Sequence, residues 1–147
     1  MEQATKLAIQ QSRDGFLGFL HHIVIDSRPE PRLFREIGDK WQWGLMKKLA
    51  PAIEAVAGLN RGYNGPRRFW IGLPRGHDKT GAIGRTIAWL LSFSRRKVQC
   101  VAAAGDTEQA SRLAHFMEDE SEHNLWYKQF LEFNNRVVKG NPDTGSR

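Results

Sequence analysis

The stretch Gly72-Leu73-Pro74-Arg75-Gly76-His77-Asp78-Lys79-Thr80, or GLPRGHDKT, decides which fold the rest of this sequence predicts. It is close to the phosphate-loop pattern G-x-x-x-x-G-K-[ST], in which a glycine-rich turn leads into a lysine and a hydroxyl residue. Lys79 and Thr80 fit that pattern, but Asp78 replaces its second glycine and Gly72 lies one position too far upstream. The loop must therefore be judged by its surroundings.

Those surroundings predict a strand before the loop and a helix after it. Residues 68–73 form a short apolar run rich in strand formers, and residues 79–93 carry apolar side chains at helical spacing. A second apolar run follows at 97–104. The next helix is expected to be capped by Asp106, with Gln109 as the capping-box partner. This order of elements predicts a right-handed βαβ unit and a parallel sheet.

The residues before the loop predict helices. Residues 6–25 have apolar side chains at helical spacing, with interruptions expected near Gly15 and Gly18. After a proline-rich break, a second helical segment is expected from residue 32 to about residue 56. Pro51 is expected to break or restart it, because proline removes a helical hydrogen bond.

The predicted fold class is α/β: an incomplete parallel sheet of the P-loop NTPase type with flanking helices, preceded by an N-terminal helical segment. We expect that segment to span residues 1–66. Residues 67–147 are expected to form the first βαβ portion of an ATPase domain, truncated at its C-terminal end. The unfinished sheet would leave an open edge, which favours association or instability of the chain.

Composition and charge indicate the kind of partner and the cellular location of this protein. A net charge of +6 and a pI near 9.8 favour a polyanionic partner, and basic residues cluster at 61, 67 and 68 and again at 95–97. No apolar run reaches the roughly 18 residues that a membrane span needs, and no secretory signal is present, so a cytoplasmic location is predicted. Cys100 is the single cysteine, which excludes a disulfide framework and predicts a small buried side chain.

A phosphate loop needs backbone N–H groups turned toward the anion and a lysine and a hydroxyl at the start of a helix. We expect Gly76 and the backbone of His77 and Asp78 to form the cradle. Lys79 would bridge the terminal phosphate oxygens, and Thr80 would be a ligand of Mg²⁺.

The sequence leaves more than one possible contact for Arg75 and Asp78. Pro74 and Arg75 belong to the cradle, and Arg75 would reach the phosphates or a neighbouring subunit. The Asp78 carboxylate repels a triphosphate unless it points away, pairs with Arg75 or faces the metal ion. Gly81 and Gly84 weaken the helix, which predicts a close approach near its start.

The half of the site that would hydrolyse ATP is missing from the sequence. An ATPase needs a carboxylate at the end of a second strand. Residues 117–120 (MEDE) have suitable side chains, but they continue a helix and are expected to be a solvated helix end. Residues 23–26 end in an aspartate but precede the loop.

The string from Pro74 to Thr80 resembles the phosphate loop of phage large terminase subunits, which often reads Pro-Arg-Gly-x-x-Lys-[Ser/Thr]. Residues 105–110 are similar to the segment after that family's second strand, and Trp41-Gln42 is similar to its adenine-side glutamine motif. The resemblance implies ATP and Mg²⁺ as cofactors, with Gln42 on the nucleotide and Lys79 and Arg75 as catalytic residues.

The same resemblance implies the partners and the setting. These are double-stranded DNA, a small terminase subunit and a portal, in the cytoplasm of a host cell, with ATP driving DNA into the prohead. It also implies a longer protein, since the family's magnesium-binding strand and nuclease domain follow the region seen here. Two alternatives stay open: another ATPase acting on nucleic acid, such as a helicase-like protein, and a non-catalytic basic α/β module that binds DNA.

Overall fold

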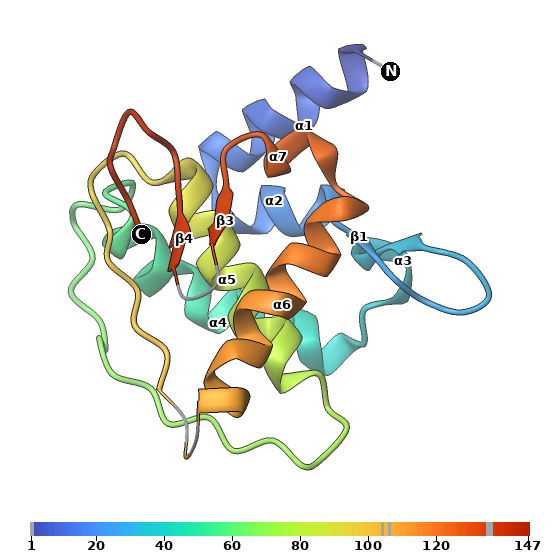
Figure 1. Ribbon diagram of the computed structural model, residues 1–147. Helices are drawn as coiled ribbons and strands as arrows, with labels where there is room; N and C mark the ends of the chain where they lie inside the picture. Colours follow the sequence, from blue (N-terminus) through green and yellow to red (C-terminus); the bar gives the residue numbers. More distant parts are fainter. Residues whose placement is uncertain (1, 104, 106, 135–136) are drawn as a thin grey trace.

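Helices form the body of this protein, and its strands within the described residues are two short antiparallel pairs (Figure 1). The computed structural model describes residues 2–103, 105, 107–134 and 137–147. None of the described strands runs parallel to another. The predicted α/β fold with a parallel sheet is therefore wrong.

The N-terminal helices break where glycine was expected to interrupt them. Helix α1 (Glu2–Asp14) and helix α2 (Phe16–His22) are separated by Gly15 alone. Gly18 does not interrupt α2, but a side chain there would meet the Gln11 carbonyl oxygen at 2.2 Å, so glycine allows the two helices to pack closely. Helix α2 contributes three of the most deeply buried side chains, Phe16, Phe19 and Leu20.

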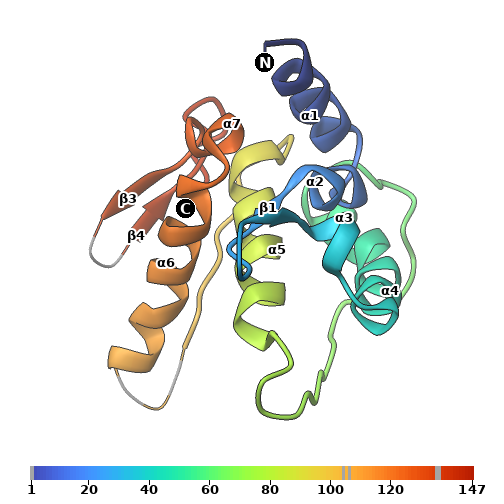
Figure 2. The same ribbon diagram turned by 90° about the vertical axis from the view of Figure 1, so that its right-hand side faces the viewer.

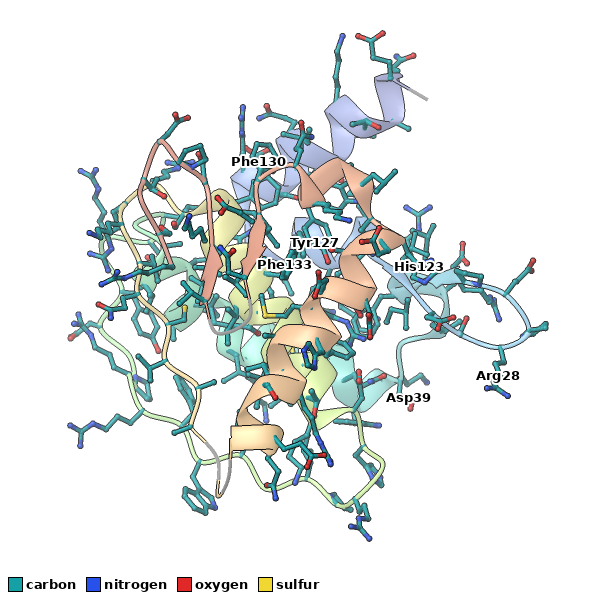
Figure 3. The ribbon with its side chains drawn as sticks, viewed as in Figure 1. Arg28, Asp39, His123, Tyr127, Phe130 and Phe133 are labelled. Atoms are coloured by element: carbon teal, nitrogen blue, oxygen red, sulfur yellow. The ribbon has the colours of Figure 1, made fainter. Side chains whose placement is uncertain are left out.

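A small hairpin connects α2 to the next helices. Strand β1 (Val24–Ile25) pairs with β2 (Arg32–Leu33), and Arg28 lies on the loop that projects between them (Figures 1 and 3). The short helix α3 (Phe34–Ile37) follows directly.

Helix α4 (Lys40–Val56) continues through Pro51, so the expected break is absent. Proline leaves the carbonyl four residues earlier, that of Lys47, without its helical partner. Both Pro51 and Lys47 lie on the exposed side of the helix. Water can therefore hydrate the free carbonyl, and the helix continues at modest cost.

The centre of the protein is helix α5 (Lys79–Phe93), which begins and ends at the residues that periodicity predicted. In Figure 2 it lies between α4 and helix α6 (Thr107–Glu122). Trp89 of α5 is fully buried and donates its ring N–H to the Ser12 carbonyl at 2.8 Å. Because Trp89 and Phe16 belong to one core, residues before and after the loop fold together.

The predicted strands on either side of α5 do not pair with each other. Residues 68–73 make no backbone hydrogen bond to another described segment, and Trp70 is 99% exposed. In residues 97–103, the Cys100 N–H instead donates to the Arg147 carbonyl at 2.9 Å. Figure 2 shows the two segments on opposite sides of α5. A strand requires a partner for its N–H and C=O groups, and neither segment provides one for the other.

The C-terminal part closes the core with aromatic side chains. Helix α7 (Leu125–Lys128) precedes β3 (Glu132–Asn134), which pairs with β4 (Val137–Lys139). Phe130 meets the ring of Phe93 edge-on at 5.3 Å. Figure 3 shows Tyr127, Phe130 and Phe133 in this region. No described helix is both long and apolar enough to cross a membrane.

Candidate phosphate-binding site

The loop from Pro74 to Thr80 lines one hollow at the start of helix α5. Gly76 has a φ of 82°, a left-handed conformation that favours glycine, and Asp78 has a φ of 49°. The Asp78 carbonyl accepts the first helical hydrogen bond, from Ala82 at 2.9 Å. Asp78 is therefore the N-cap residue of α5, and its side chain makes no capping bond.

The side chains that were predicted to contact phosphate are accessible. Arg75, Lys79 and Thr80 are exposed, and neither cation forms an ion pair with a described carboxylate. The positive end of the α5 dipole lies at the same place. The loop therefore presents two free cations, a hydroxyl and a helix N-terminus to solvent.

Asp78 turns its carboxylate toward the protein body. Its Oδ2 atom accepts a hydrogen bond from Arg85 Nη1 at 2.6 Å and one from Gln42 Nε2 at 3.3 Å. Of the arrangements that would relieve repulsion of a phosphate, the structure has a pairing, but with Arg85 of α5 rather than with Arg75. The Asp78 carboxylate is thereby paired with a cation of α5.

Arg85 connects this carboxylate to a second one on α6. Only 3% of the Arg85 side chain is exposed, and its Nη2 lies 2.8 Å from Oε2 of Glu120, which is 6% exposed. Its Nε donates to both Glu120 oxygens, at 3.2 and 3.0 Å. The rings of Phe34 and Phe116 lie 5.3 and 5.6 Å from the guanidinium carbon. Arg85 is thus fixed on every side.

Burial and charge act in opposite directions on this network. Burial lowers the pKa of Arg85, but Glu120 and Asp78 raise it more, so the guanidinium stays charged. Burial raises the pKa of Glu120 to about 7, against the effect of Arg85. A buried charge is stabilised only when it is paired and hydrogen-bonded, and both conditions are met here.

Two glycines of α5 leave the space that this arrangement of side chains requires. A Cβ at Gly81 would lie 2.0 Å from Asp78 Oδ1, so glycine leaves room for the carboxylate. A Cβ at Gly84 would lie 2.7 Å from the Phe116 ring, so glycine also lets α6 approach α5. The close approach predicted near the start of the helix is confirmed, and its partners are a carboxylate and an aromatic ring.

Gln42 lies beside the loop, but its side chain already has two partners. Its Oε1 accepts from the Asp39 N–H at 2.8 Å in a capping box at the start of α4, and its Nε2 donates to Asp78. The neighbouring Trp41 is 39% exposed, with its ring 5.8 Å from the His77 ring. The glutamine thus connects α4 to the loop.

Thr80 is the site's candidate for contact with Mg²⁺. Its exposed hydroxyl fits a metal ion held mainly by phosphate oxygens, as Mg²⁺ commonly is. The described residues contain no group of three or more histidine, cysteine, aspartate or glutamate side chains that could hold a metal ion on their own. Any Mg²⁺ here would therefore arrive with its phosphate ligand.

Comparisons with protein-family models, curated proteins and solved structures gave no match. The site must therefore be interpreted from its own geometry.

Sequence reasoning missed the two residues that fix the loop. Glu120 was expected on a solvated helix end, and that prediction is wrong because the side chain is buried against Arg85. A signal was present: Glu120 lies three residues after Met117, on the inner face of α6, and Arg85 lies four residues before Trp89 on the buried face of α5. The predicted cap at residue 106 lies outside the described residues.

Proposed function

We propose that residues 74–80 bind the phosphate groups of a nucleoside triphosphate, ATP together with Mg²⁺. The observation that supports this most directly is the pairing of Asp78 with Arg85 at 2.6 Å. Asp78 is the only acidic residue among the described residues that line the loop hollow. This carboxylate is paired with Arg85, and the other described residues that line the hollow are positively charged or neutral.

Each group has a role in this proposal. The N–H groups at the start of α5 donate hydrogen bonds to phosphate oxygens, and the helix dipole favours their negative charge. Lys79 adds a mobile positive charge, Arg75 adds a second from the loop, and the Thr80 hydroxyl contacts the metal ion. When bound, Mg²⁺ neutralises charge on the phosphate oxygens. The proposal concerns binding, because the hollow shows no second carboxylate among its described residues for hydrolysis.

We propose further that this site is the ATP-binding part of a DNA-packaging motor of the large-terminase kind. The support for this wider activity is the motif from Pro74 to Thr80 alone. The implied partners are duplex DNA, a small terminase subunit and a portal. If nucleotide and DNA binding are coupled, duplex DNA should change the apparent affinity for MgATP about fivefold or more. No change would contradict the motor and leave the nucleotide site standing.

Calorimetric titration of the chain with MgATP tests the nucleotide site. A charge-assisted hydrogen bond to phosphate contributes about 1.5–3 kcal/mol, so Lys79→Ala should weaken binding roughly tenfold to a hundredfold. Lys47→Ala is the matched control, since Lys47 is an exposed lysine on α4. It removes the same charge away from the loop and should leave the affinity unchanged.

Two outcomes would overturn the nucleotide site. One is the absence of MgATP binding by a folded wild-type chain. The other is an equal affinity for the Lys79→Ala and Lys47→Ala variants, which would reduce the loop to a turn between an extended segment and a helix.

A further inference from the structure

A second hollow, which we call the arginine groove, lies at the C-terminal end of α4. It encloses about 610 Å³, and its arginines are Arg61, Arg67, Arg95 and Arg96. The two pairs are far apart in sequence, but the Arg95 N–H donates to the Ala57 carbonyl at 2.8 Å. Arg96 also donates from its side chain to the Val56 and Ala55 carbonyls, at 2.7 and 3.1 Å. The turn after α5 is thereby fastened to the end of α4.

The groove has an uncompensated positive charge. None of its described lining residues is acidic. Arg61, Arg67 and Arg95 are exposed and form no ion pair with a described carboxylate, although such pairs occur elsewhere in the chain. Several guanidinium groups around one hollow repel each other unless an anion lies between them. Arginine is also suited to phosphate, because its planar fork donates two parallel hydrogen bonds.

Aromatic rings lie beside these charges. Phe69 is 46% exposed, and both Phe69 and Tyr63 line the groove. The Tyr63 hydroxyl donates to the Pro66 carbonyl at 2.7 Å, which fixes the position of its ring. Apolar side chains, among them Ile53 and Leu90, complete the lining. The groove therefore combines sites for phosphate with flat apolar surfaces.

We propose that the arginine groove binds single-stranded nucleic acid. Arginines that contact phosphates, together with rings on which bases stack, form the usual binding surface for unpaired strands. In a duplex the base faces are stacked on one another and cannot reach Phe69 or Tyr63. An acidic peptide would satisfy the arginines but has no planar bases for the rings. The volume lies within the range of roughly 300–1,000 Å³ that is usual for ligand sites.

Fluorescence anisotropy with a labelled 12-nucleotide deoxythymidine strand at low salt tests whether the arginines of the groove bind the strand. The triple variant Arg61→Ala, Arg67→Ala, Arg95→Ala should bind at least tenfold more weakly. The slope of log affinity against log salt should fall by about two, since each phosphate contact on a single strand contributes roughly 0.7. Arg96 is left in place because it caps α4.

The control is a second triple variant, Arg13→Ala, Arg28→Ala, Arg35→Ala. It removes the same net charge from exposed arginines outside the groove and should change the affinity less than threefold. Circular dichroism and thermal unfolding of both triple variants verify that each is folded.

A second arm tests the stacking. Phe69→Leu should weaken binding of the thymidine strand about fivefold or more, since base stacking on an aromatic ring contributes that much per base. Binding of an abasic strand of equal length and charge should not change, because it has no base to stack.

Four results would overturn the proposal: no binding of the strand, equal effects of the two triple variants, a loss of duplex DNA binding in the groove triple variant as large as its loss of strand binding, or displacement of the strand by polyglutamate at equal charge. The proposal does not depend on the nucleotide site. Lys79→Ala should bind the strand normally, and the groove triple variant should bind MgATP normally.

Discussion

Arg85 holds the carboxylate of Asp78 at 2.6 Å and, through its other nitrogens, the carboxylate of Glu120 on another helix. The residue that departs from the phosphate-loop pattern is thus tied to the core by the most thoroughly buried cation described in the chain. The loop and helix α6 are connected through a single side chain. Three predictions follow from this connection.

The first concerns the charge of Asp78. Asp78→Gly should leave MgATP affinity unchanged or tighten it, because the variant removes a negative charge and glycine readily adopts a φ of 49°. The free energy of unfolding of the Asp78→Gly variant should differ from that of the wild type by no more than about 1 kcal/mol. Loss of a partly exposed ion pair is offset by relief of the left-handed conformation. Titration and urea unfolding measure the two effects, and a clear loss of affinity in the folded variant would contradict this account.

The second concerns Gly81. Gly81→Ala should lower the free energy of unfolding by about 1–3 kcal/mol, because its Cβ would overlap Asp78 Oδ1 and would also lie 2.9 Å from Arg85 Nη1. The effect should be smaller when Asp78→Gly is present as well, because the 2.0 Å overlap is then gone and only the 2.9 Å approach to Arg85 Nη1 remains. Gly44→Ala is the control: nothing lies within 4 Å of its Cβ, so alanine should stabilise α4 by up to about 1 kcal/mol. Equal effects of Gly81→Ala with and without the carboxylate would refute the overlap.

The third concerns pH. Burial raises the pKa of Glu120 to about 7, whereas in the unfolded chain it is near 4.5. In the folded chain Glu120 therefore holds its proton to a higher pH than in the unfolded chain. Its contribution to the free energy of unfolding is complete below pH 4.5 and is lost as the pH rises to about 7. The free energy of unfolding should fall more steeply with pH in the wild type than in Glu120→Gln.

Urea unfolding of both chains at pH 4.5, 6 and 7.5 measures that difference. The groups that bear on Glu120 are Arg85 on α5, Asp78 at the loop and Tyr127 on α7, and all three are unchanged in the variant. Parallel profiles for the two chains would show that Glu120 is ionised throughout this range.

Local pattern placed the long helices and both ends of α5, but it missed strands β1 and β2 and wrongly predicted a break at Pro51. The spacing of apolar residues placed α5 at residues 79–93, and the break at Gly15 was also predicted correctly. These features depend on neighbours within one or two turns, which a sequence displays directly. The aromatic side chains of Trp126, Phe130 and Phe133 pack against the same core, but only Trp126 lies on a helix.

The sheet could not be predicted in the same way. Residues 68–73 and 97–103 have the composition of strands, but pairing requires a neighbour, and no local pattern reveals whether one exists. The same limit applies to the site. Arg85 and Glu120 are 35 positions apart, so only folding shows that they meet. The loop itself was visible in the sequence because its residues are consecutive.

The overlap between the Asp78 carboxylate and a Cβ at position 81 affects the order in which these two positions can change during evolution. A Cβ at position 81 would lie 2.0 Å from Asp78 Oδ1 and 2.9 Å from Arg85 Nη1, so alanine at 81 costs least in a lineage that has already lost the carboxylate at 78, whereas loss of the carboxylate imposes no matching demand on 81. The order of the two substitutions is therefore constrained in one direction. Related chains should contain aspartate with glycine, or a smaller residue at 78 with glycine or alanine at 81, but not aspartate at 78 with alanine at 81.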